Sequence, residues 1–326
     1  MQHISFAAGP FEIHSIPVES AASTSTDSQP AILAFCLPGA LPMLRNSTNF
    51  LGKAMAFYTT EFGSYPFSSY KAVFVSNPHT QATTSASLSI LSSDLLYPTS
   101  VVDQAIETRQ VLSLALISQW VGVNIIQKTL ADTWLINGLA LYIASLFLRS
   151  LLGNNEWRFR LKKDINRCAS MDSGEQHPIC VPGTIDPHDA PTLTFMNLKA
   201  PLVLHILDRK LSQAGSSLGL SRVIPKVFLS SLSGELQNNM LSTHAFMRTC
   251  RKVSGLDLTA FQDQWIYGSG CPQLTVRAGF VKKKFIVELQ VQQTVPAAAQ
   301  LDQLYPEKVR TATAWKKPAQ FFDVRF

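Results

Sequence analysis

The chain has 326 residues, enough for one large domain or two ordinary ones with a well-buried core. Apolar residues make up 46% of it and charged residues only 15%, which excludes a largely disordered chain. The formal net charge of +6 is a mild basic excess that suits a nucleic-acid or acidic-protein partner without excluding an enzyme.

In the N-terminal third, the residue pattern predicts one strand before and one strand after a helical stretch. Met1–Phe11 has no basic region followed by an apolar run, so we expect no secretory signal. A short apolar strand is predicted at 31–36, where Leu37-Pro38-Gly39 ends it with a turn. Apolar residues then recur at helical spacing from about Leu44 to Phe62, and a second strand follows at 70–75.

From Asp103 to Gly270 the pattern is mostly helical. The strongest predicted helices are 103–127, 132–152, 154–168 and 195–211, with a pair over 241–267. A proline-containing loop at 171–191 divides them. The apolar run Trp134–Leu148 is interrupted by polar residues and is too short for a membrane span of roughly twenty residues, so it predicts a buried core helix and no membrane.

After Gly270 the period changes to two. Residues 274–280 and 284–291 alternate between apolar and polar, with Val281-Lys282-Lys283 between them, and so predict a hairpin that opens a β domain. The remaining residues are few for a complete sandwich, so we expect the chain to stop partway through a larger protein. The five cysteines are far apart and lack CxxC spacing, which favours reduced thiols in the cytosol or nucleus over a disulfide framework.

Two segments at a fixed separation resemble a metalloenzyme signature. Residues 114–122 are LALISQWVG and residues 134–142 are WLINGLALY. They resemble the gluzincin zinc aminopeptidases, whose patterns are HELAHQWFG and WLNEGFASY. In that family two His one helical turn apart and a Glu from the next helix bind zinc, and the Glu of the first motif activates the bound water.

Carried over position by position, the resemblance leaves no catalytic residue. The zinc-binding His positions are Leu114 and Ser118, the general base is Ala115, and the third ligand is Asn137. The family's Tyr-x-Lys-Gly motif, whose Tyr stabilises the oxyanion, matches 197–200, so Asn197 replaces the Tyr while Lys199 is kept. The strand that holds the substrate amine in the family should fall near 81–85 and keeps only one matching residue. We therefore expect no metal, no cofactor and no catalytic activity.

A second resemblance covers roughly residues 1–300. The chain resembles the family of the second TBP-associated factor (TBP-associated factor 2) of the general transcription factor TFIID, which is aminopeptidase-like without the active site. The segments that carry this resemblance are 4–12, 35–39, 63–71, 86–90, 199–203, 241–243, 253–255, 264–270 and 280–284. The most specific of them are 63–71 (GSYPFSSYK) and the block from Trp265 to Lys284.

This resemblance implies an α+β fold in three parts. Residues 1–42 would be the tail of an N-terminal β domain. Residues 43–270 would form a thermolysin-like, mostly helical aminopeptidase-type domain without a zinc site, and residues 271–326 the start of a β-sandwich. The implied function is that of a non-catalytic structural subunit of TFIID in the nucleus, which aids assembly and engagement of core-promoter DNA and chromatin. Its partners would be TBP, other TBP-associated factors and promoter DNA.

The sequence offers one candidate surface for DNA. Arg277, Lys282, Lys283 and Lys284 make the predicted hairpin basic, and nine Lys or Arg stand against four Asp or Glu from residue 274 to the end. Such a patch can neutralise phosphates without reading bases, although a solvated hairpin tip has the same composition. Two alternatives to a scaffold stay open: a degenerate aminopeptidase-like protein that binds peptides, and a divergent metallo-aminopeptidase.

Overall fold

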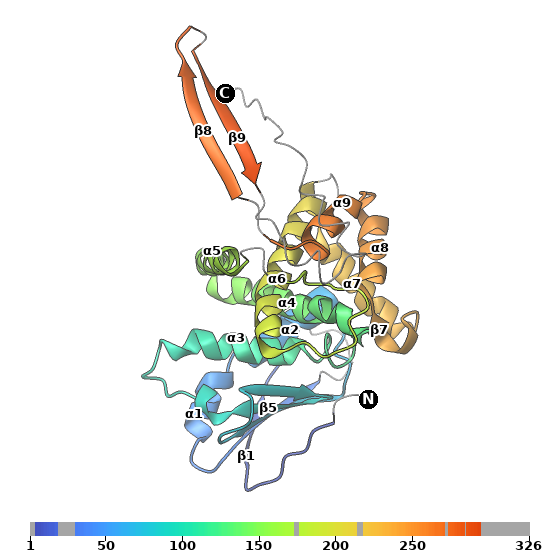
Figure 1. The fold of residues 1–326 in the computed structure, drawn as a ribbon. Coiled ribbons are helices and arrows are strands. Elements are labelled where there is room, and N and C mark those ends of the chain that lie inside the picture. The colour runs from blue at the N-terminus through green and yellow to red at the C-terminus, as the bar shows by residue number, and fades with distance from the viewer. Residues whose placement is uncertain are drawn as a thin grey trace.

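The computed structural model describes residues 4–18, 30–172, 176–213, 218–270, 273–283 and 285–294. A five-stranded sheet lies at one end of a helical body, and a two-stranded hairpin projects from the other end (Figure 1). The mixture of helix and sheet agrees with the predicted α+β class. The predicted β-sandwich falls largely on residues outside the described ranges and stays a prediction.

The sheet has the strand order β1-β2-β3-β5-β4. Its strands are β1 Glu12–Ile16, β2 Ala31–Cys36, β3 Ser69–Val75, β4 Ala82–Ser85 and β5 Leu88–Ser92. The three inner strands β2, β3 and β5 run parallel, and β1 and β4 close the two edges antiparallel. Tyr70, Ala72, Val73 and Phe74 of β3 are all buried, as expected for a central strand covered on both faces. Both predicted strands in this region are confirmed.

Strands β1 and β2 belong to the same sheet as β3, β4 and β5. β1 and β2 come from the segment predicted as the tail of a separate β domain, and β3 to β5 come from the segment assigned to the helical domain. The ladder between β2 and β3 joins residues 31–35 to residues 69–73. The division of the chain at residue 42 therefore stays a prediction, with one sheet crossing it.

Nine α-helices are present in the described ranges. They are α1 Leu41–Thr48, α2 Leu51–Phe62, α3 Gln104–Ile117, α4 Thr133–Leu152, α5 Asn154–Met171, α6 Ala190–Gln213, α7 Leu220–Leu232, α8 Thr243–Ser254 and α9 Thr259–Phe261. Shorter elements are the 3-10 turns Ser93–Leu95, Leu130–Asp132 and Gln237–Asn239, the π-turn Gln262–Ile266, and the strand pair β6 Ile126–Gln127 with β7 Met240–Leu241.

Two helix predictions need correction. The helix predicted to reach Gln127 ends at Ile117, because Gly122 adopts φ +127° and its N–H donates to Ile125 O in a tight turn. Helix α7 is not among the predicted helices, although its buried residues follow helical spacing: Leu220, Val223, Ile224, Val227 and Phe228. Pro225 inside α7 obscures that pattern.

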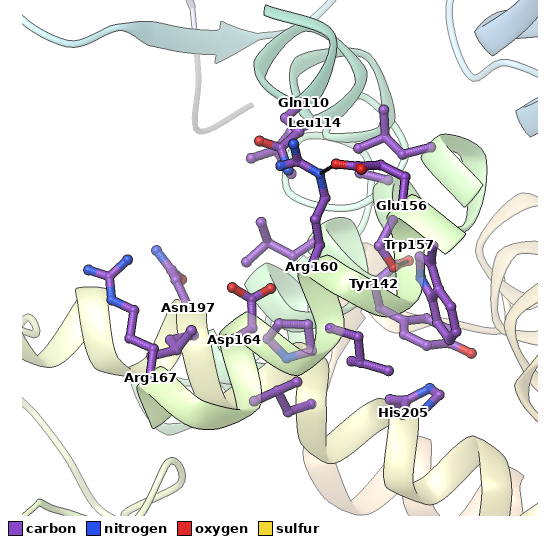
Figure 2. Close-up of a pocket in the computed structure, with 18 of the residues that line it drawn as sticks. Gln110, Leu114, Tyr142, Glu156, Trp157, Arg160, Asp164, Arg167, Asn197 and His205 are labelled. Carbon is purple, nitrogen blue, oxygen red and sulfur yellow. Dashed lines mark hydrogen bonds and ion pairs between the residues drawn. The ribbon is translucent and has the colours of Figure 1, made fainter. Parts of the chain in front are cut away.

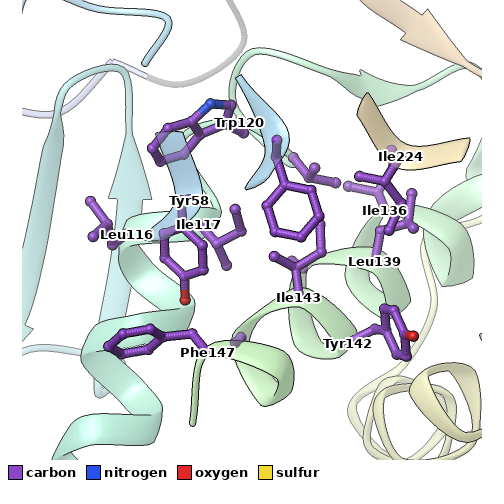
Figure 3. Packing of buried hydrophobic residues seen from close by; sticks show 14 of the residues in the cluster. Tyr58, Leu116, Ile117, Trp120, Ile136, Leu139, Tyr142, Ile143, Phe147 and Ile224 are labelled. Atoms are coloured by element: carbon purple, nitrogen blue, oxygen red, sulfur yellow. The ribbon is translucent and has the colours of Figure 1, made fainter. Parts of the chain in front are cut away.

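Helix α4 is the centre of the core. It packs between α3, α5 and α6, and most of its side chains are buried. Tyr58 from α2 lies between Trp120 and Phe147, with ring centroids 5.9 and 5.6 Å away (Figure 3). Residues Leu130–Leu152 are long and apolar enough to span a membrane by length and composition, but their burial inside the helical body supports the predicted core helix.

The hairpin after residue 270 is confirmed. β8 Gln273–Val281 pairs antiparallel with β9 Ile286–Thr294, with Val276 opposite Val291 and Phe280 opposite Val287. Strand β8 extends through Val281, so the turn begins at Lys282, one residue later than predicted.

Helices α4 and α6 approach each other closely at Gly138, where a Cβ atom would lie 2.9 Å from Ala200 Cβ. We expect Gly138→Val to lower the free energy of unfolding by about 1–3 kcal/mol, because the extra methyl groups must push the two helices apart. Urea unfolding followed by circular dichroism measures this. The matched control is Gly279→Val in β8, where nothing lies within 4 Å of the added Cβ and a change below about 0.5 kcal/mol is expected. Equal effects of the two substitutions would contradict the tight crossing.

Candidate functional site

The five positions that match aminopeptidase catalytic residues lie on three neighbouring helices. Leu114 and Ala115 are in the last turn of α3 and Ser118 caps it, while Asn137 is in α4 and Asn197 in α6. The structure brings Asn137 and Asn197 together, since Asn137 Nδ2 donates to Asn197 Oδ1 over 3.0 Å. The matched third-ligand position and the matched tyrosine position are therefore in direct contact.

These side chains do not fit a zinc ion. Leu114 and Ala115 carry no donor atom, and the amide of Asn137 is engaged by Asn197. The Ser118 hydroxyl donates to Leu114 O at 2.7 Å, which satisfies it within its own helix. Among the described residues no three His, Cys, Asp or Glu side chains lie close enough to hold a metal ion.

Gln119 and Trp120, which match the aminopeptidase pattern of the first motif, bond to other parts of the fold. Gln119 is fully buried, donates from Nε2 to Ser85 O at 3.0 Å and accepts from Ser87 N at 2.9 Å. These bonds tie the segment after α3 to the turn between β4 and β5, next to the strand β4 that corresponds to the predicted amine-binding strand near 81–85. Trp120 donates from Nε1 to Ser64 O at 3.0 Å. Both side chains satisfy buried or partly buried backbone groups, which is a structural role.

A buried network fixes the start of the second motif. Trp134 Nε1 donates to Thr243 Oγ1 at 3.0 Å, and Asp132 Oδ1 accepts from Thr243 N at 2.7 Å and Thr243 Oγ1 at 2.8 Å. The N-termini of α4 and α8 are thereby joined over 111 residues of sequence. Burial raises the pKa of the neighbouring Cys180 to about 11, so this thiol is protonated and unreactive at neutral pH. No local pattern in the sequence indicates this network, because its members are far apart in the chain.

Lys199, the residue kept from the Tyr-x-Lys-Gly motif, forms a buried ion pair. Its Nζ lies 2.5 Å from Asp172 Oδ2, and the two side chains are 5% and 0% exposed. Asp172 Oδ1 also accepts from Gly270 N at 3.1 Å. The pair therefore connects α6, the end of α5 and the segment that leads into β8. Nothing in the spacing of these residues predicted the partner of Lys199.

A pocket of about 400 Å³ opens beside the degenerate site (Figure 2). Leu114 and Asn197 belong to its wall, so the matched zinc position has become part of a largely apolar surface. The candidate DNA-binding residues lie elsewhere. Arg277, Lys282 and Lys283 are exposed on the hairpin, which projects from the helical body, and Lys284 lies outside the described residues (Figure 1).

Known proteins resemble this chain in sequence and in fold. No model of a known protein family matches it. Transcription initiation factor TFIID subunit 2 of Schizosaccharomyces pombe is 44% identical over 296 residues, which are 89% of this chain and 25% of that protein. The protein of the same name from Saccharomyces cerevisiae is 38% identical over 252 residues, 76% of this chain and 18% of that protein. The chain thus spans about a quarter or less of the length of these two relatives.

Among solved structures, aminopeptidase A of Legionella pneumophila in complex with aspartic acid matches with a TM-score of 0.68. The match covers 88% of this chain and 31% of that one, at 16% sequence identity. At that identity the likeness shows the fold alone. It confirms the predicted aminopeptidase-like fold.

Replacing Lys199 tests the buried ion pair. We expect Lys199→Met to lower the free energy of unfolding by about 3–5 kcal/mol, because Asp172 would keep a buried charge without its cation. Chemical unfolding measures the loss. Adding Asp172→Asn to that variant should recover part of it, and Lys226→Met at an exposed position of α7 should cost less than about 0.5 kcal/mol. A loss for Lys199→Met no larger than this control would show that the pair does not stabilise the fold.

Proposed function

We propose, on the premise that this chain belongs with the TFIID subunit 2 proteins, that it is the aminopeptidase-like part of a non-catalytic TFIID subunit. The proposal rests on a difference between two sets of residues in the matched motifs: those that bond to the rest of the fold and those matched to zinc ligands and the general base. Gln119, Trp120, Trp134 and Lys199 are retained and bonded into the frame, whereas the matched ligand and base positions have no suitable donor. An aminopeptidase-like fold without suitable zinc ligands or a general base fits a protein that works through its shape and its surface.

The proposed partners are those of an initiation factor. TBP and the other TBP-associated factors would surround the chain in the nucleus, and core-promoter DNA would lie near it. For direct DNA contact we propose the hairpin residues Arg277, Lys282, Lys283 and Lys284. The first three are exposed, and a two-stranded ribbon can place such cations against a phosphate backbone.

Affinity purification of the tagged full-length protein from its own nuclei tests the scaffold function. We expect TBP and its associated factors to co-purify in near-stoichiometric amounts, because a structural subunit is stably built into its complex. Mass spectrometry of the eluate measures this. A protein found mainly in the cytosol, without TBP or its associated factors, would reject the proposal.

Restoring the catalytic residues tests the loss of enzyme activity. The variant Leu114→His, Ala115→Glu, Ser118→His, Asn137→Glu should release no amino acids from peptide substrates, although it regains the ligand types for zinc. Asn197 would still supply no oxyanion donor equivalent to Tyr, and the strand at 82–85 would still lack the carboxylate for the substrate amine. Zinc content by mass spectrometry and turnover of an aminoacyl fluorogenic substrate are the two readouts. Robust turnover by this variant would show that the rest of the cleft still supports catalysis. Turnover by the unmodified protein with bound zinc would favour the divergent metallo-aminopeptidase instead.

A further inference from the structure

Helices α3, α4, α5 and α6 together form the wall of the pocket beside Leu114 and Asn197. Val111 and Leu114 of α3, Leu141 and Leu148 of α4, and Leu198 and Leu202 of α6 supply apolar surface. Its volume of about 400 Å³ falls within the range of ligand pockets, about 300–1,000 Å³. The wall is therefore suited to one or two large apolar side chains.

Helix α5 closes the pocket and supplies all of its Asp, Glu and Arg residues, namely Glu156, Arg160, Asp164 and Arg167. Arg160 pairs with Glu156 over 2.7 Å, as the dashed line in Figure 2 marks. Trp157 is held between two neighbours, with the Arg149 guanidinium 5.0 Å from its ring centroid and the His205 ring 5.4 Å away. This wall is pre-organised, which lowers the entropic cost of binding.

The outer face of the same helix is basic. α5 carries five Lys or Arg residues against two Asp or Glu. Arg158, Lys162, Lys163 and Arg167 are exposed, and within the described ranges only Arg160 of the five takes part in an ion pair. Phe159 lies among these cations and is 64% exposed. Two carboxylates on α5 offset part of this charge, since Glu156 pairs with Arg160 and Asp164 lies near Arg160, Lys163 and Arg167. Five cations against two carboxylates still leave a basic helix beside the apolar pocket, which suits a negatively charged partner.

We propose that this pocket docks an acidic, amphipathic peptide segment of a protein partner. An apolar anchor side chain would enter between α3, α4, α5 and α6, and flanking Asp or Glu residues would pair with the cations of α5. Duplex DNA fits the cations but not the cavity, because phosphate-backbone binding makes no use of a buried apolar pocket. The inference goes beyond the proposed function, since it holds whether or not the chain is built into TFIID.

Selection from a display library of random peptides of about twelve residues tests the inference with the full-length protein. Enriched peptides are sequenced, synthesised with a fluorescent label and titrated by anisotropy. We expect Leu, Phe or Trp next to Asp or Glu in the enriched peptides. Ser145→Phe, which fills the pocket from α4, should weaken binding by about tenfold or more. Thermal melting checks that this variant stays folded.

A charge-reversal pair at two exposed positions of α5, one of them at the rim of the pocket, gives a second test. Lys163→Glu with Arg167→Glu should weaken the same peptides by about tenfold, because two cations one turn apart become like charges for the acidic flanks. The matched control is Arg222→Glu with Lys226→Glu, an exposed pair of the same spacing on α7, which should leave binding within about twofold.

Three outcomes would overturn the inference. They are enriched peptides without acidic residues, unchanged binding to both the pocket-filling and the charge-reversed variants, or no enrichment at all. A labelled duplex DNA that binds α5, is lost on charge reversal and is unaffected by Ser145→Phe, with no peptide enriched, would make this face a nucleic-acid surface instead.

Discussion

The close crossing of α4 and α6 is the constraint on which the rest of the site depends. Gly138 lets the α4 backbone approach Ala200, and no larger residue fits there without moving a helix. The two residues beside this contact are Asn137 on α4, which bonds Asn197 on the neighbouring helix, and Lys199 on α6, which pairs with Asp172. One steric contact therefore aligns the degenerate catalytic positions, places the buried cation and sets the width of the pocket wall.

In the first matched motif, the residues that bond to the rest of the fold are different from those that match zinc ligands and the general base. Gln119 and Trp120, in the turn that follows α3, bond to backbone groups of the β4–β5 turn and of the loop before β3. Leu114, in the last turn of α3, lines the pocket, and the Ser118 hydroxyl bonds to Leu114 O. The aminopeptidase-like fold is present at 16% identity to a solved aminopeptidase, and the long-range bonds of Gln119 and Trp120 contribute to it without any metal.

The surface that remains is suited to binding. Leu114 and Asn197 lie in the wall of a largely apolar pocket, and α5 brings charged residues to its edge. An apolar cavity bordered by cations can bind a partner without moving protons or polarising a bond. Such binding would agree with the proposed scaffold function, since affinity between proteins comes from buried anchors surrounded by polar contacts.

The sequence by itself determined the local patterns. The period of apolar residues predicted most helices, the inner strands β2 and β3 and the hairpin, but not the inner strand β5. The resemblance to aminopeptidase motifs predicted Leu114, Ala115, Ser118, Asn137 and Asn197 as the matched catalytic positions, which stays a prediction. The apolar pattern did not predict where α3 ends, because a glycine turn overrides helical spacing there. It also did not predict α7, because an internal proline masks the amphipathic pattern of that helix.

Only the tertiary structure decided what each retained residue does. The partners of Gln119, Trp134 and Lys199 lie 27 to 109 residues away, and no local pattern encodes such distances. The pocket likewise exists only once four helices have packed, because its apolar residues are indistinguishable in sequence from those that fill the core. Burial and long-range pairing are properties of the whole fold, and periodicity reports only the face on which a residue lies.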